Sequence, residues 1–168
     1  AQLFSNFNSC ESLVLPNRTL TFYYTSASGK VNNFYIPDMA KYCISTFSGS
    51  GSPAAYANSL YIGNYSRTYN KVSALNLNSY GITQLPSYAF YGCKAITELD
   101  ATSLTTHNQY IFYNSGITNL ILDNHGASSS IAAYAYGNCT SLATITDRST
   151  TPWTTLNNQA FMGVNSSV

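Results

Sequence analysis

The sequence predicts a repeat solenoid built from short parallel strands, with a mostly irregular or turn-rich convex side and little α-helix. Three observations favour this fold class: an aromatic residue recurs at a nearly constant interval, charged residues are scarce, and the polar surface consists of uncharged side chains. Of the 168 residues, 59 are Ser, Thr or Asn and only 8% are charged, against about 25% in an average soluble protein. Uncharged polar residues of this kind favour strands, turns and asparagine ladders over helices.

The repeat is clearest around four aromatic anchors. Phe90, Phe112, Tyr136 and Phe161 lie 22, 24 and 25 residues apart. Around Phe90 and Tyr136 the chain reads Ala-aromatic-x-x-Cys-x-x-aliphatic-x-x-aliphatic. A period of this length indicates supersecondary units that cannot bury their apolar face alone and therefore stack on one another. We predict that the structural core of the repeats consists of Phe90, Cys93, Phe112, Tyr136, Cys139 and Phe161.

The upstream half fits the same template less closely. We interpret residues 1–168 as one solenoid of about seven coils and as part of a longer protein, with the better-matching repeats in 72–168 and degenerate repeats in 1–71. One parallel sheet is expected, with strands near 12–15, 33–36, 74–77, 97–100, 119–122 and 143–146. The pairs that point inward would be Leu13/Leu15, Phe34/Ile36, Leu60/Ile62, Leu75/Leu77, Leu99/Ala101, Leu120/Leu122 and Ile145/Asp147.

One interval does not fit this spacing. Only 15 residues separate Ile62 from Leu77, which is too few for a complete coil. Either residues 60–62 belong to an inserted hairpin, or the register of the chain between 48 and 71 differs from the one assumed here.

The motif itself resembles a known family. The pattern Leu-x-x-Leu-x-Leu, then Ile-x-x-Leu, then Ala-Phe-x-x-Cys-x-x-Leu resembles the BspA-type leucine-rich repeat, also called the Treponema pallidum type; its most specific piece is Ala89-Phe90-x-x-Cys93. The resemblance implies a curved leucine-rich-repeat solenoid with a binding role at a microbial surface, in adhesion or host-protein recognition. It implies an extracellular or cell-surface location and no shared catalytic residues.

Charge and composition exclude several classes of partner. The formal net charge is +1, so there is no basic face to bind nucleic acid by counterion release. No apolar run approaches the roughly 20 residues of a membrane-spanning helix, so membrane insertion is not expected. His107 and His125 lack the spacing and third ligand of a metal site, and we expect both to be solvated loop residues. The sequence therefore predicts no cofactor, no metal and no enzyme activity.

The four cysteines are predicted to be free. Cys10, Cys93 and Cys139 are assigned to the same slot of the repeat, whereas Cys43 lies outside the pattern. Cys93 and Cys139 are two coils apart, so their Cα atoms should be about 10 Å apart. A disulfide requires less than about 7 Å. We therefore expect buried thiols that act as small apolar side chains.

A ligand would most readily bind the outward side of the strands. A solenoid presents one side chain per coil in a parallel column, and the residue between each inward pair should point outward. The candidate ligand-binding residues in this column and the column two residues earlier are Tyr35, Tyr61, Asn76, Glu98, Asp100, Asn119 and Ile121. Tyrosine supplies large contact areas at low entropic cost, so this surface suits a host or neighbouring-cell protein or a glycan. By contrast, Tyr88, Tyr91, Tyr110 and Tyr113 are expected to be structural residues that cover the convex side.

Two other functions remain open on the sequence. The first is a structural fibre or spacer domain, on a virion surface for example, and exposed coil ends would allow such a chain to form oligomers. The second is a carbohydrate-active enzyme that uses Glu98 and Asp100, two carboxylates flanking Leu99 on one strand and expected to be about 7 Å apart.

Overall fold

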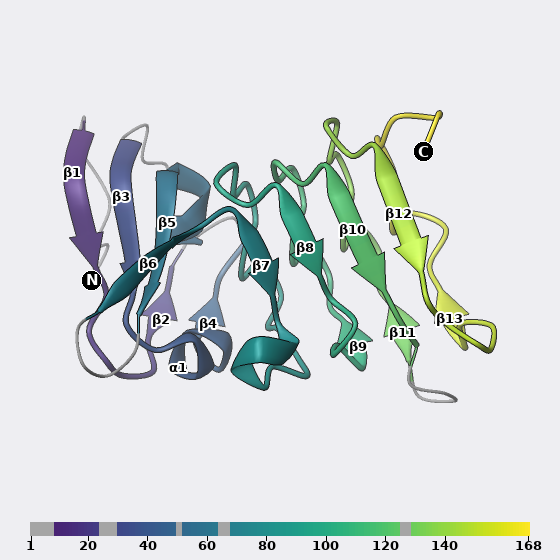
Figure 1. The fold of residues 1–168 in the computed structure, drawn as a ribbon, viewed down its shortest axis with the longest axis horizontal. Helices are drawn as coiled ribbons and strands as arrows, with labels where there is room; N and C mark the ends of the chain where they lie inside the picture. The colour runs from purple at the N-terminus through teal and green to yellow at the C-terminus, as the bar shows by residue number, and fades with distance from the viewer. Residues whose placement is uncertain (1–8, 24–29, 50–51, 64–67, 125–128) are drawn as a thin grey trace.

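A computed structural model describes residues 9–23, 30–49, 52–63, 68–124 and 129–168, which form a β-solenoid of parallel strands (Figure 1). Two four-stranded sheets lie along its front, with the strand orders β1-β3-β5-β6 and β7-β8-β10-β12. The first sheet contains β1 (Ser9–Val14), β3 (Lys30–Ile36), β5 (Ala57–Gly63) and β6 (Tyr69–Val72). The second contains β7 (Ala74–Asn76), β8 (Glu98–Asp100), β10 (Asn119–Leu122) and β12 (Thr144–Asp147).

The expectation of one continuous sheet is wrong, because the hairpin β5–β6 interrupts the stacking. Strand β6 runs antiparallel to β5, with Leu60 opposite Val72 and Gly63 opposite Tyr69. In Figure 1 it crosses diagonally in front of β3 and β5 before the chain enters β7. Residues 60–62 therefore belong to an inserted hairpin, which accounts for the short interval before Leu77.

The predicted alternation of inward and outward side chains is confirmed. Phe34 lies between Leu13 and Leu60 in the first sheet, and Leu99 lies between Leu75 and Leu120 in the second. The outermost strands β1 and β12 depart from the pattern, because no strand among the described residues covers their outer side: on β1 Leu13 is half-buried, and on β12 Ile145 is 36% exposed. Asp147, in the last inward position, is exposed and accepts a hydrogen bond from Trp153 Nε1 at 2.8 Å.

The rest of each coil is built from shorter elements. Behind the front sheets lie two further parallel sheets, β2-β4 and β9-β11-β13. These strands and the helical segments are β2 (Thr21–Phe22), β4 (Thr46–Phe47), β9 (Thr106–His107), β11 (Ser130–Ile131), β13 (Thr155–Leu156), the five-residue α1 (Met39–Cys43), and the 3₁₀ segments η1 (Pro53–Tyr56) and η2 (Asn78–Tyr80). The coil closes through tight turns at 87–92, 109–114 and 133–138, which we call the turn side. Neighbouring turns are joined by backbone bonds, such as Phe90 N to Ile111 O at 2.8 Å.

Stacked aromatic rings fill the core from coil to coil. The Phe90 and Phe112 centroids are 5.1 Å apart, Phe112 and Tyr136 are 6.0 Å apart, and Tyr136 and Phe161 are 5.5 Å apart, with all three ring pairs within 12° of parallel. Phe90, Phe112 and Tyr136 are fully buried, as predicted. Phe161 is only half-buried, because it ends the stack. Tyr42 packs against the upstream end of the stack in a tilted arrangement, with its centroid 5.4 Å from that of Phe90 and the ring planes at 51°.

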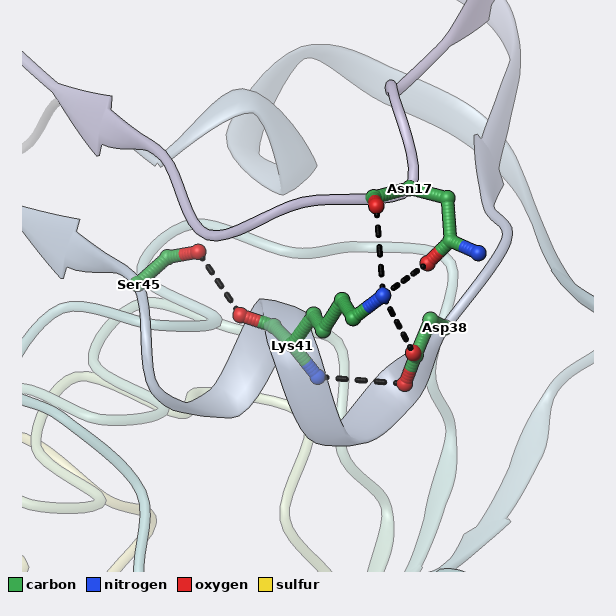
Figure 2. Close-up of polar contacts among 4 residues, drawn as sticks. All are labelled: Asn17, Asp38, Lys41 and Ser45. Carbon is green, nitrogen blue, oxygen red and sulfur yellow. Dashed lines mark hydrogen bonds and ion pairs between the residues drawn. The ribbon is translucent and has the colours of Figure 1, made fainter.

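A polar cluster connects the helix α1 to the loop between β1 and β2, as Figure 2 shows. Asp38 caps α1, accepting a hydrogen bond from Lys41 N at 3.1 Å, and its carboxylate lies 3.6 Å from Lys41 Nζ. The same ammonium group donates to Asn17 Oδ1 at 3.0 Å and Asn17 O at 3.2 Å. Ser45 Oγ donates to Lys41 O at 2.8 Å and accepts from Leu20 N at 3.1 Å. The cluster therefore has a structural role, since its polar groups form hydrogen bonds and an ion pair with one another and with the adjacent backbone.

We predict that Phe112→Ala lowers the free energy of unfolding by about 3–5 kcal/mol, because it opens a cavity in the middle of the aromatic stack. Chemical denaturation measures this loss. Tyr80→Ala, which truncates an exposed ring, is the control and should cost far less. Equal losses for the two variants would contradict the placement of Phe112 at the centre of the core.

Candidate functional site

The outward face of the second sheet carries a shallow hollow of about 130 Å³. Registered pairing brings the predicted outward residues into rows across the strands: Asn76 lies beside Asp100 and then Ile121, and Glu98 lies beside Asn119. The hollow is lined by Ala74, Leu75, Asn76, Glu98, Leu99, Asp100, Asn119 and Ile121. Five of the seven residues predicted from the sequence therefore line one depression, which we call the strand-face hollow.

Hydrogen bonds fix the polar groups of the strand-face hollow. Asn76 Nδ2 donates to Asp100 Oδ2 at 3.3 Å. Asp100 Oδ1 accepts from Thr102 N at 3.1 Å and from Thr102 Oγ1 at 2.6 Å. Asn119 Oδ1 accepts from Thr144 Oγ1 at 2.6 Å, while Glu98 is exposed. The hollow thus combines oriented amide and carboxylate groups with apolar surface from Ala74 and Ile121, an arrangement suited to hydrogen-bonded recognition.

The two predicted tyrosines lie together on the first sheet. Tyr35 and Tyr61 occupy paired positions on β3 and β5, and their ring centroids are 4.6 Å apart at 17°. Tyr69 on β6 packs edge-on against Tyr35 at 5.1 Å and 80°. Sequence reasoning did not find Tyr69, because the inserted hairpin follows no repeat. These three half-buried rings, the tyrosine cluster, form a second feature on the same side of the solenoid.

The prediction that His107 is a solvated loop residue is wrong. His107 lies on β9 with its ring fully buried, because its place opposite Ile131 in the β9-β11-β13 sheet turns it inward. Its Nδ1 lies 2.6 Å from the hydroxyl of Tyr136, and Trp153 packs edge-on against the ring at 5.4 Å. The histidine thus supplies a hydrogen-bond partner for a buried phenol. His125 lies outside the described residues.

The cysteines are free, as predicted, but one of them sits elsewhere in the coil. Cys93 and Cys139 are buried beneath the turn side, and Ser115, which takes the cysteine slot of the intervening coil, lies 3.2 Å from Cys139 Sγ. Cys10 does not share this slot: it lies on β1 opposite Val31, and it is half-buried because β1 is an edge strand. In the part of the chain that the structure describes, no group of three His, Cys, Asp or Glu side chains could hold a metal ion.

Comparison with known proteins identifies the repeats. Residues 60–167 match the family model described as a BspA type leucine-rich repeat region in six copies. No curated protein and no solved structure matched the chain. Among the described residues, no helix has the length and apolar character needed to cross a membrane.

The buried thiols predict a loss of stability at high pH. Burial raises the pKa of Cys93 to about 11 and that of Cys43 to about 12, from 9.0. Above pH about 9 the unfolded chain loses these protons and the folded chain keeps them, so the free energy of unfolding should fall as pH rises. Each thiol contributes up to about 1.4 kcal/mol per pH unit.

Denaturation between pH about 8 and about 10 measures this slope, before most unfolded-state tyrosines ionise. Cys93→Ala should be less stable than the parent at neutral pH but show a shallower slope. An unchanged slope would mean that burial does not raise the pKa of Cys93.

Proposed function

The chain belongs to the BspA-type leucine-rich repeat family, and we propose that it is a non-catalytic binding module whose outward strand face holds a protein or glycan ligand at a cell surface. The family suggests a surface or binding repeat module, and its members are usually at the surface or extracellular. A solenoid serves this purpose because stacked coils present a periodic surface for recognition.

The observation that carries the proposal is the strand-face hollow. It gathers side chains from β7, β8 and β10, so only the assembled repeats create it. The side chains of Asn76, Asp100 and Asn119 are already oriented by neighbours, which lowers the entropic cost of binding. The apolar surface of Ala74 and Ile121 adds contact area without charge. A ligand rich in hydroxyl or amide groups matches this surface best.

The geometry favours binding over turnover at Glu98 and Asp100. Both oxygens of Asp100 already accept hydrogen bonds from Asn76 and Thr102, so neighbouring side chains and backbone engage this carboxylate. The depression is also shallow, which offers little exclusion of water. Assay of a glycan panel tests the alternative: turnover that Glu98→Gln abolishes would overturn the non-catalytic assignment.

The ligand can be sought on an array of glycans and matrix proteins and then titrated against variants. We expect Asp100→Asn and Asn76→Ala to weaken binding of the hit, because each removes part of the fixed hydrogen-bonding row. The tyrosine cluster should contribute as an aromatic anchor, so Tyr61→Ala should cost about 2 kcal/mol, or roughly 30-fold in Kd. Affinity should depend only weakly on salt.

The matched control is Asp123→Asn, which removes the same charge from a half-buried position in the loop after β10, outside the strand-face hollow. It should leave Kd unchanged. If Asp100→Asn, Asn76→Ala and Tyr61→Ala all left the Kd of the ligand unchanged, the ligand would bind elsewhere on the molecule.

A structural fibre or spacer is the second candidate. The observation that favours it is apolar exposure at the C-terminal end of the described repeats, at Ile145, Leu156 and Met162. Such a surface can pack against another coil. Sedimentation separates the two functions: a stable trimer or filament together with an array that yields no hit would favour the fibre, and a monomer that binds a hit would favour the binding module.

A further inference from the structure

The turn side of the solenoid carries five stacked tyrosines that the proposed function does not use. The first column consists of Tyr88, Tyr110 and Tyr134, with ring centroids 5.0 and 5.1 Å apart and planes within 9° of parallel. The second column pairs Tyr91 with Tyr113 at 5.4 Å and 18°. All five rings are half-buried. We call this array the tyrosine ladder.

The backbone under the first column is held in an unusual conformation. Tyr88, Tyr110 and Tyr134 have φ values of 67°, 59° and 59°, in the left-handed region that disfavours a bulky side chain. The coils do use glycine for positive φ nearby, at Gly92 and Gly163. Tyrosine therefore recurs three times at a backbone position where glycine would be less strained. A strained backbone conformation of this kind persists only where the surrounding structure enforces it.

The stacking decides which atoms of the tyrosine ladder solvent can reach. Within each column the ring faces cover one another, so few faces remain for an incoming sugar or aromatic group. The ring edges remain, and these carry the hydroxyl and the Cε carbons beside it. Parallel rings at coil spacing thus bring the reactive edges of Tyr88, Tyr110 and Tyr134 into one row.

We propose that the tyrosine ladder is a site of oxidative cross-linking, in which a haem peroxidase and hydrogen peroxide join neighbouring coils through dityrosine. Each of two stacked phenols loses one electron and one proton, and the two radicals form a bond between their Cε carbons. The hydrogen on each joined carbon then leaves as a proton while the phenoxyl oxygen regains one. The net change is the loss of two hydrogen atoms from the protein, and one hydrogen peroxide becomes two water molecules.

The surroundings of the tyrosine ladder direct oxidation to the phenols. Cys93 and Cys139 lie beneath the same turns but are buried, and burial raises the pKa of Cys93 to about 11, so its nucleophilic thiolate is scarce near neutral pH. A bond from Tyr88 to Tyr110 would close a 22-residue loop and constrain the unfolded chain, as a disulfide does.

The test treats the purified full chain, at low concentration, with a haem peroxidase and hydrogen peroxide. After reduction, which reverses any disulfide, the monomer should have lost hydrogen atoms in pairs and should show dityrosine fluorescence. Peptide mapping should join Tyr88 to Tyr110, Tyr110 to Tyr134, or Tyr91 to Tyr113. The cross-linked monomer should unfold at a higher temperature than the untreated chain.

Tyr110→Phe is the decisive variant, because phenylalanine preserves the ring stack but cannot form a phenoxyl radical. It should lose both links of the first column and keep the link between Tyr91 and Tyr113. The control Tyr80→Phe should behave as the parent. Circular dichroism verifies that both variants fold.

Three results would overturn the proposal. One is reaction mainly at Tyr23 and Tyr80, which are 57% and 37% exposed and stack on no ring within the described residues. Another is cross-linking only between molecules. The third is reaction at the Tyr35–Tyr61 stack, whose rings are 4.6 Å apart, with none at the tyrosine ladder.

Discussion

The stacking of buried aromatic rings from coil to coil is the interaction on which the other features of the molecule depend. Each coil buries only a narrow apolar stripe, so it is stable only against its neighbours. The rings of Phe90, Phe112 and Tyr136 lie nearly parallel, and backbone hydrogen bonds between successive turns hold the same spacing. The front strands, on the other side of each coil, stack at the same spacing, and their outward side chains therefore form straight rows.

The same packing joins two halves that differ in sequence. Tyr42 on α1 packs against Phe90, and its hydroxyl donates to Ala89 O at 2.6 Å, which Ser52 Oγ also contacts at 2.6 Å. The core is thus continuous across the hairpin β5–β6, although the front sheet is not. One consequence is that the outward face has two parts, with the tyrosine cluster on one sheet and the strand-face hollow on the other.

Features that follow from a local period could be predicted from the sequence, and features that depend on a distant partner could not. The 22- to 25-residue spacing located the ring stack, and alternation along the strands placed Asn76 and Asp100 outward. The burial of His107 depends on Tyr136, 29 residues away, and on Trp153, and neither contact leaves a local pattern. Tyr69 lies on a strand that breaks the repeat, and its neighbour Tyr35 comes from β3.

Recognition through the outward strand face is the central functional claim, and an NMR titration with the array-selected ligand tests it most directly. The side-chain amides of Asn76 and Asn119 report on the strand-face hollow, while those of Asn114 and Asn138 report on the turn side. We predict saturable shifts of the Asn76 and Asn119 signals with those of Asn114 and Asn138 unmoved. Shifts confined to Asn114 and Asn138 would contradict the claim.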